Sequence, residues 1–386
     1  MNPRPGARAA IASLLAASLA GAAGDKIEYG AYSIDDNSGV TVTSTAFSLA
    51  KTVWARTRLY LDVELDQTTI PPLESGIGIS TDAITGASRP ARQSKSEFRK
   101  NRGQIIGGVD QGLGDNTEVS AHYYNSQETD FASQALVAGI TQNLAEKNFT
   151  IAVIAQYTLD SVGEILSANG SLRNRAKETH QASVAITQLL SPVAFIRFGG
   201  DAMRNIGFLS DPYRLVSRPD PGDPLKTVAV PEQVPETRWR QAAWIEYDQY
   251  LTALAGSYSI EYRYAWDDWN LTSHMVWFKL NKYVTPNWVF SPQYRFYEQT
   301  AADFGDYTLG DANRYFAPGD RKLQAFGAHF IGAGLTCYLR AFTKKHPTWE
   351  FLRGGSITVK VARYFTDLAP GNDAVNVREA HLRFEF

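Results

Sequence analysis

Long segments in which apolar and polar residues alternate recur along almost the whole of this 386-residue chain. The segment 58–66 reads RLYLDVELD, with Leu or Val at every odd position and mainly charged residues between them. The segments 288–299 and 379–386 alternate in a similar way. Successive side chains of a β-strand point to opposite faces, so a period of two predicts strands with one apolar and one polar face. We therefore expect an all-β protein.

The length of the segments and the place of their aromatic residues favour a membrane barrel over a soluble sandwich, which alternates too. The segments are about 10–14 residues long, as a tilted strand that crosses a membrane requires. Aromatic residues make up 12% of the chain and gather near segment ends, where the aromatic girdles of a membrane barrel would lie. The tryptophans expected in these girdles are Trp239, Trp244, Trp266, Trp269, Trp288 and Trp349.

The connections between these segments alternate in length, and this is the strongest argument for a barrel. Short turns are expected at 52–54, 112–115, 145–147, 191–192, 250–252 and 284–286, with a somewhat longer one at 341–348. Long loops are expected at 67–98, 161–177, 205–235, 300–322 and 366–375, all at the opposite end. A soluble all-β protein has no reason to sort its loops in this way. We predict a transmembrane antiparallel up-and-down β-barrel of about 16 strands, with short periplasmic turns and long extracellular loops.

The first 22 residues have the pattern of a cleaved signal peptide. Arg4 and Arg8 precede a short apolar run, which ends in the small residues Ala20, Gly21 and Ala22. Residues 23–386 then form a single barrel domain. After residue 22, no stretch approaches the roughly 18 unbroken apolar residues that a membrane helix needs. We expect export to the outer membrane of a Gram-negative bacterium, in contact with its lipids and lipopolysaccharide.

The end of the chain and its charge bear on the partners. Phe386 closes a segment with apolar residues at alternate positions, which is typical of the terminal strand that barrel-assembly machinery recognises. The formal net charge is −2, so there is no electrostatic reason to expect nucleic acid as a partner. The chain has one cysteine, Cys337, which excludes an internal disulfide and is interpreted as a small packed hydrophobic residue.

Five segments of the chain form a recognisable set of motifs: the start of the mature chain at Asp25, DAITGAS (82–88), YYNSQETDF (123–131), GFLSDPYR (207–214) and YRFYEQTAADF (294–304). They resemble the motifs of an uncharacterised family of Gram-negative outer-membrane β-barrel proteins. The resemblance covers nearly the whole mature chain and keeps the order of the motifs. It implies a barrel and supplies no catalytic residues. Members are often encoded near a flavin transferase and a thioredoxin-like protein, which implies possible periplasmic redox partners.

The segment DAITGAS has two interpretations. It is similar to the target that periplasmic flavin transferases modify, and this would make Ser88 the acceptor of a covalent FMN and Asp82 the upstream acid. Serine stands where the commoner target has threonine, and the predicted topology places the segment outside the cell. The alternative is an ordinary turn, because Asp, Thr, Gly and Ser favour turns by themselves. No other cofactor, catalytic group or metal site is expected.

The polar face of the strands carries charges of both signs, which predicts an aqueous or paired lumen. The candidate lumen-lining residues are Arg58, Asp62, Glu64, Asp66, Arg197, Glu261, Arg263, Arg295, Lys360, Glu379 and Arg383. A barrel of about sixteen strands is wide enough for a water-filled channel. The first hypothesis is a porin-like passive channel for small polar solutes. The second is a non-enzymatic scaffold or sheath in a flavin-associated redox assembly of the envelope.

Overall fold

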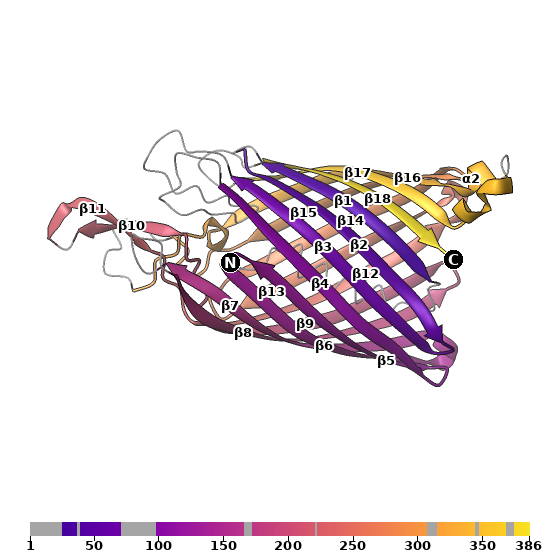
Figure 1. The fold of residues 1–386 in the computed structure, drawn as a ribbon, viewed down its shortest axis with the longest axis horizontal. Helices are drawn as coiled ribbons and strands as arrows, with labels where there is room; N and C mark the ends of the chain where they lie inside the picture. Colours follow the sequence, from indigo (N-terminus) through magenta and orange to yellow (C-terminus); the bar gives the residue numbers. More distant parts are fainter. Residues whose placement is uncertain are drawn as a thin grey trace.

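The computed structural model shows a closed antiparallel β-barrel, with a small hairpin projecting from one end (Figure 1). It describes residues 25–36, 39–70, 98–165, 172–220, 222–306, 315–343, 347–367 and 374–386. The ring of strands runs in the order β1-β18-β17-β16-β15-β14-β13-β12-β9-β8-β7-β6-β5-β4-β3-β2. The predicted fold class and the predicted sixteen strands are confirmed.

The barrel strands in the first half of the chain are β1 (Lys26–Asp36), β2 (Thr41–Trp54), β3 (Thr57–Ile70), β4 (Phe98–Leu113), β5 (Thr117–Glu128), β6 (Phe131–Leu144), β7 (Phe149–Ile165) and β8 (Leu172–Ser191). Those in the second half are β9 (Ala194–Gly207), β12 (Thr237–Leu251), β13 (Gly256–Asp267), β14 (Thr272–Thr285), β15 (Trp288–Gln299), β16 (Phe326–Tyr338), β17 (Gly355–Thr366) and β18 (Ala374–Glu385). The projecting hairpin consists of β10 (Leu215–Asp220) and β11 (Asp223–Pro231).

The first and last strands close the ring. Lys26 pairs with Glu385 at one end of the β1–β18 ladder and Asp36 pairs with Val375 at the other. A closed ring leaves no strand edge with unpaired backbone groups, which is the condition for a sheet to stand in lipid. None of the described helices is long and apolar enough to cross a membrane.

The alternation in the sequence separates the two faces of the wall as predicted. On β3, Leu65 is 61% exposed on the outer face, whereas the neighbouring Asp66 is only 5% exposed on the inner face. Val359 on β17 is likewise exposed, at 51%. Apolar side chains outside and polar side chains inside invert the arrangement of a soluble domain. This is the arrangement expected of a barrel surrounded by lipid.

The two ends of the barrel differ as the loop pattern predicted (Figure 1). Short turns join β2 to β3, β4 to β5, β6 to β7, β8 to β9, β12 to β13 and β14 to β15 at one end. The β16–β17 connection at this end is longer and contains α2 (Arg340–Thr343) and the 3₁₀ segment Pro347–Leu352. The opposite end bears the long connections 208–236 and 300–325, including the β10–β11 hairpin.

Two of the predicted loops are wrong in detail. The predicted loop 161–177 is mostly strand, because β7 extends to Ile165 and β8 begins at Leu172. Glu164 on β7 forms ion pairs with Arg173 and Arg175 on β8, and these pairs hold the polar ends of the two strands in extended form. The predicted loop 205–235 contains the β10–β11 hairpin, whose strands pair from Leu215 with Pro231 onward. Polar sequence alone did not distinguish a projecting ladder from a loop.

The aromatic girdle is confirmed at some positions and wrong at others. Trp239, Trp266 and Trp288 lie close to strand ends with partly exposed rings. Trp244 lies in the middle of β12 and pairs with Arg263, on the same face as the polar residues of the lumen. Trp269 is buried among loop residues beyond the end of β13. Since Trp244 and Trp269 contact protein, neither can serve as an interfacial anchor.

Candidate functional site

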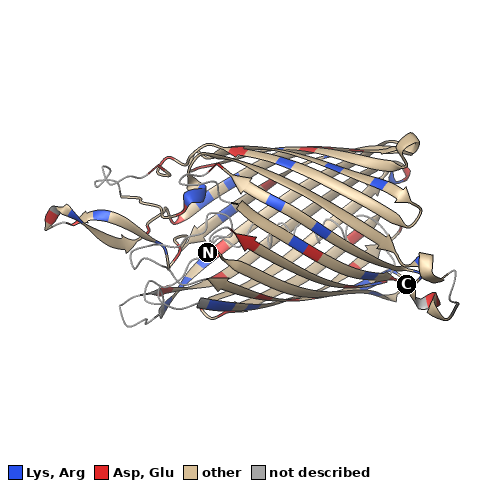
Figure 2. Cartoon of the chain, turned by 90° about the horizontal axis from the view of Figure 1, so that it is seen from above, with Lys and Arg blue, Asp and Glu red and all other residues tan. Residues whose placement is uncertain are grey.

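The inner face of the barrel is mainly polar, apart from an apolar cluster of Ile106, Tyr124, Ala135 and Val137 on β4–β6, and charged residues occur along the length of the strands (Figure 2). In an antiparallel ladder, directly paired residues share a face. Glu246 on β12 pairs directly with Arg197 on β9 and with Glu261 on β13, so the three side chains lie on the same face. The same reasoning places every predicted lumen residue on the inner face: Arg58, Asp62, Glu64, Asp66, Arg197, Glu261, Arg263, Arg295, Lys360, Glu379 and Arg383.

The three acidic residues of β3 form a hydrogen-bonded layer with their neighbours. Tyr32 on β1 donates to Glu64 at 2.9 Å, and Ser48 on β2 donates to Asp62 at 2.5 Å. Asp66 accepts from the Nε of Arg102 on β4 at 2.6 Å. Buried carboxylates need such donors, because an unpaired charge away from water is costly. These contacts hold the side chains against the wall.

A second network lies on β9, β12, β13 and β14. Arg197 forms an ion pair with Glu246, and Lys279 lies 3.4 Å from the same carboxylate. Arg263 pairs with Asp201 at 2.7 Å. Three cations and two carboxylates meet in these pairs, and Glu261 adds a further carboxylate beside Glu246. This side of the lumen is therefore locally close to neutral.

The strands near the closure of the ring carry a further network. Lys360 donates to Glu379 at 2.9 Å, and His381 lies 3.4 Å from Glu379 and 3.4 Å from Glu28. Arg383 pairs with Glu385 near the end of β18. Lys360 and His381 thus share one carboxylate, which ties β17, β18 and β1 together through their side chains.

Two predicted lumen residues stand apart from these networks. Neither Arg58 nor Arg295 makes an ion pair with any residue that the structure describes. Arg58 lies at the start of β3, near the short-turn end of the barrel. Arg295 lies within β15, where aromatic rings on the neighbouring strands flank it. The guanidinium carbon lies 5.6 Å from the ring centre of Trp277 and 5.3 Å from that of Phe330.

A segment of the 208–236 connection crosses the mouth at the long-loop end. We call Phe208–Arg214 the mouth strap. Tyr213 donates a hydrogen bond to Asp130, which connects β5 and β6. Its neighbour Arg214 lies 2.9 Å from Asp320, in the connection between β15 and β16. The two connections start eight places apart in the ring of sixteen strands, so adjacent residues of the strap contact connections that arise from opposite sides of the barrel.

One side of the strap is anchored to the wall through Lys100. Lys100 on the inner face of β4 lies 2.8 Å from Glu128 and 2.6 Å from Asp130. Its ammonium also lies 5.6 Å from the ring centre of Tyr213. Burial, together with the hydrogen bond to Asp130, raises the pKa of the Tyr213 phenol above its usual range. Tyr213 therefore stays a neutral donor at every physiological pH.

The other side of the strap is held by a buried group that we call the mouth cluster. It consists of the charged residues Asp211, Arg214, Glu232 and Asp320 and of Gly319, which takes part through its backbone. Glu232 accepts the backbone N–H groups of Asp211 at 2.5 Å and Gly319 at 2.8 Å. Burial raises the pKa of Glu232 to about 7, aided by the charges of Asp211 and Asp320 and opposed by that of Arg214. The cluster thus holds a carboxyl group that titrates near neutral pH.

Apolar packing completes the mouth. The buried residues of this packing are Val234, Trp269, Leu271, Ala302, Phe304 and Leu323. The rings of Trp269 and Phe304 meet edge to face at 5.0 Å, and Trp269 donates through its indole N–H to the carbonyl of Thr237. These residues come from three connections at the same end of the barrel, which explains why Trp269 is buried.

Sequence reasoning missed this mouth, although the signal was present. The segments 123–131, 207–214 and 294–304, singled out by resemblance, supply Asp130, Tyr213 and Phe304 to it. Of the predicted flavin site, Asp82 and Ser88 lie outside the described residues, so that interpretation stays a prediction. In the part of the chain that is described, no group of three His, Cys, Asp or Glu side chains is placed to hold a metal ion.

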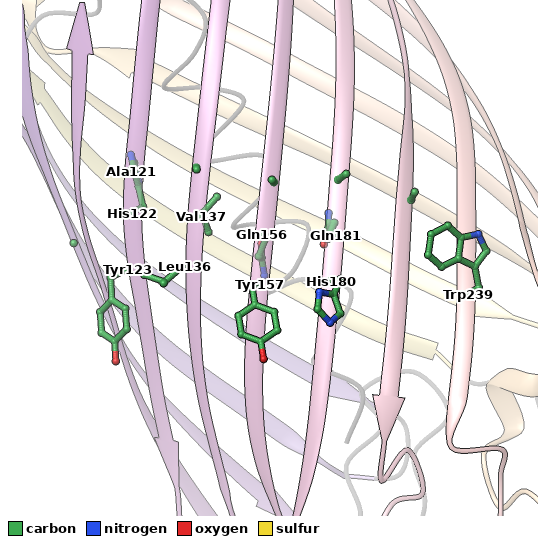
Figure 3. A pocket seen from close by; sticks show the side chains of 15 residues that line it. Ala121, His122, Tyr123, Leu136, Val137, Gln156, Tyr157, His180, Gln181 and Trp239 are labelled. Carbon is green, nitrogen blue, oxygen red and sulfur yellow. The ribbon is translucent and has the colours of Figure 1, made fainter.

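The outer face of β5–β9 carries a shallow groove of about 740 Å³ (Figure 3). A row of alanines forms its floor, with Ala121, Ala138, Ala155, Ala182 and Ala202 paired directly from strand to strand. Larger side chains rim one edge, where the rings of Tyr157 and His180 contact each other in a tilted arrangement with centres 4.9 Å apart. The small side chains make this part of the outer surface concave.

The model of the family described as "Protein of unknown function (DUF3570)" matches residues 12–351. The chain belongs to this family. The match covers most of the barrel as well as the mouth strap, and it confirms the resemblance seen in the sequence.

Solved structures similar to this chain are outer-membrane proteins. A bacterial polysaccharide outer membrane secretin aligns with a TM-score of 0.51 at 7% identity, over 94% of this chain and 98% of the secretin. The CymD monoaromatic hydrocarbon channel aligns with a TM-score of 0.44 at 8% identity, over 95% of this chain and 90% of CymD. A mutant of the ferric enterobactin receptor PfeA from Pseudomonas aeruginosa aligns at 0.45 and 10%, over 89% of this chain and 53% of the receptor. At such identities the likeness concerns the fold, which is that of an outer-membrane β-barrel.

Proposed function

We propose that this protein is a passive outer-membrane channel for small polar solutes, whose outer mouth is narrowed by the mouth strap. The observation that carries the proposal is the mainly polar, charged inner face of a sixteen-stranded ring. Barrels of this size enclose an aqueous lumen, whereas eight strands leave room only for side chains. We propose no catalytic role for the chain.

The distribution of charge across the lumen supports a polar path. On the inner face of β14–β17, strands that are described throughout, Lys279, Arg295 and Lys360 are basic and there is no carboxylate. The strands β4–β7 stand opposite in the ring, and carboxylates outnumber basic residues on their inner face. The carboxylates are Asp110, Glu118, Glu128, Asp160 and Glu164, and the basic residues are Lys100 and Arg102. Part of this negative charge is paired on the adjacent β8, where Lys177 contacts Asp160 and Arg173 contacts Glu164. The remaining imbalance favours polar solutes over apolar ones.

The orientation of the barrel follows from its two unlike ends. We propose that the end with short turns faces the periplasm and that the strap lies at the outer surface. In this orientation, a solute from outside meets the strap first and the charged lumen next. The proposal includes assembly through the terminal strand that ends at Phe386, and removal of residues 1–22 on export.

Conductance across a planar lipid bilayer tests the function. Refolded wild-type protein should give small or infrequent openings, because the strap crosses the mouth. Arg214→Gln removes the ion pair with Asp320, and Tyr213→Phe removes the hydrogen bond to Asp130. Both variants should give larger or more frequent openings.

A matched control lies on the projecting hairpin. Lys226 is exposed and pairs with Asp223 at 3.0 Å, away from the strap. Lys226→Gln makes the same change of charge as Arg214→Gln and should leave conductance at the wild-type level. If neither wild type nor the strap variants conduct, although their migration on gels is heat-modifiable, the channel proposal is wrong. The scaffold in a flavin-associated assembly would then be the better hypothesis.

A further inference from the structure

The one basic side chain on the inner face of β15 lies beside another hydrogen-bond donor, and in the described structure neither has an acceptor. Arg295 has five N–H donors and, among the described residues, no ion pair or hydrogen bond. Its direct neighbours in the register are Trp277 on β14 and Phe330 on β16. The indole N–H of Trp277 is buried and has no hydrogen-bond partner in the described structure. Two donor groups on adjacent strands therefore lack an acceptor at the same place.

The surroundings hold charges of both signs. Glu261 on β13 pairs directly with Trp277 in the register and its charge acts on Arg295, but no hydrogen bond joins it to either donor in the described part of the chain. The ammonium group of Lys279 lies 4.0 Å from the ring centre of Trp277, so a second cation flanks the same indole. Phe330 pairs directly with Tyr364 on β17, which brings a phenol to the far side of Arg295. The flanking rings come from the two neighbouring strands, one on each side of Arg295 in the register. Unsatisfied donors in such a place are costly unless a ligand supplies acceptors.

We propose that Arg295 and Trp277 form a binding site for the oxyanion group of a small solute, a carboxylate or a phosphate, inside the lumen. A guanidinium presents its N–H groups as a planar fork that matches two oxygens of such a group. The indole N–H supplies a further donor beside it. The inference deepens the proposed channel function and rests on it for its biological use, because it names the chemical class of solute that the channel would favour.

Other charged residues of the lumen do not compete for this role. Lys360 is already bound to Glu379, and Arg263 is already bound to Asp201. Arg58 also lacks an ion pair among the described residues. In the described structure, however, no aromatic rings flank its guanidinium as Trp277 and Phe330 flank that of Arg295. Arg58 therefore provides a control with equal charge at another level of the same lumen.

Calorimetric titration of refolded protein in detergent, at constant ionic strength, tests the site with acetate and inorganic phosphate as separate probes. Wild type and Arg58→Gln should bind at least one probe saturably and with affinities within about two-fold of each other. Arg295→Gln should weaken that binding by about ten-fold or more, since it removes a charge-assisted bidentate contact. Trp277→Phe keeps the ring and removes the N–H, and should weaken binding by about five-fold.

The result separates the site from the channel. Absence of saturable binding of either probe to wild type, or equal binding by Arg295→Gln, would overturn the site. An equal loss in Arg58→Gln would also overturn it, because the general field of the lumen would then explain the binding. Binding without conductance would support the site and refute the channel, whereas conductance without binding would do the reverse. Heat-modifiable migration of each variant checks that the barrel has folded.

Discussion

The mouth cluster predicts that the closed mouth weakens as the pH rises. Glu232 is 6% exposed and faces Asp211, Arg214 and Asp320. Its pKa of about 7 in the closed mouth compares with 4.5 for an ordinary glutamate. A carboxyl group whose pKa is raised by closure binds more protons in the closed state than in the open one. The stabilisation of the closed mouth by this proton is complete below pH 4.5 and is lost as the pH rises through about 7.

The size of the effect follows from these two pKa values. A difference of one between the pKa values of the closed and open states corresponds to about 1.4 kcal/mol, so the ionised mouth is destabilised by roughly 3 kcal/mol relative to the protonated one. Between pH 5.5 and pH 8.5, where only part of the titration falls, the opening equilibrium should increase by about thirty-fold. Acidification from pH 5.5 to below pH 4.5 should close the mouth further, by at most about ten-fold.

Hydrogen exchange measures this opening at the amides that depend on Glu232. The N–H groups of Asp211 and Gly319 donate to its two carboxylate oxygens. Their protection factors, which are already corrected for the intrinsic pH dependence of exchange, should be higher at pH 5.5 than at pH 8.5 by about thirty-fold. Peptides from β3 (Thr57–Ile70) lie in the barrel wall and should show no such change.

The variant Glu232→Gln gives the decisive comparison. Glutamine cannot ionise, and its amide group can accept only one of the two backbone N–H groups, so protection should fall somewhat at pH 5.5. The dependence on pH should disappear. Protection that is flat with pH in wild type, or that keeps its full pH dependence in Glu232→Gln, would refute the assignment of the titration to this residue.

The outer face, the two ends and the flavin motif each give one further prediction. Val359→Arg on the outer face should assemble poorly, because a basic group at the lipid midplane costs about 2–4 kcal/mol, whereas Glu64→Gln inside should be tolerated; equal heat-modifiable migration of the two would contradict this. A tag at Asp220 should be reached by antibody on intact cells and one at Glu146 only after the outer membrane is opened; the reverse pattern would invert the barrel. Coexpression with a periplasmic flavin transferase should add one FMN, measured by intact mass, and Ser88→Ala should abolish the gain; an unmodified mass would leave an ordinary turn.

The wall of the barrel could be predicted from the sequence because lipid and lumen impose opposite demands on alternate residues. Leu65 and Asp66 are neighbours, yet one is exposed to the outside and the other is buried inside. A slip of one residue in the register would exchange them, so the pattern identifies both the strand and its faces. The number of strands follows from the same pattern. The extension of β7 and β8 was missed because ion pairs of Glu164, rather than apolar alternation, hold that part of the ladder.

The mouth could not be predicted because its contacts join residues with no periodic relation. Tyr213 and Asp130 are 83 positions apart, and Arg214 meets Asp320 across the ring. The up-and-down order of the strands places these connections at the same end, and closure of the ring brings them together across the mouth. Arg295 finds no ion pair among the described residues for the same reason, since its neighbours Trp277 and Phe330 are set by the register and not by local sequence. Sequence placed Arg295 in the lumen but could not show which basic residues find a carboxylate.

The contacts of Asp130 show how the mouth can open while the wall stays intact. Asp130 accepts a hydrogen bond from Tyr213 of the strap and forms an ion pair with Lys100 of the wall. Displacing the strap removes the phenol but leaves the ion pairs of Lys100 with Asp130 and Glu128, so no buried charge loses its last partner. On the other side, ionisation of Glu232 attracts Arg214 but adds a buried negative charge beside Asp211 and Asp320, and burial with this repulsion outweighs the attraction. The strap is thus released through the mouth cluster, and the strand ladders below it need not break.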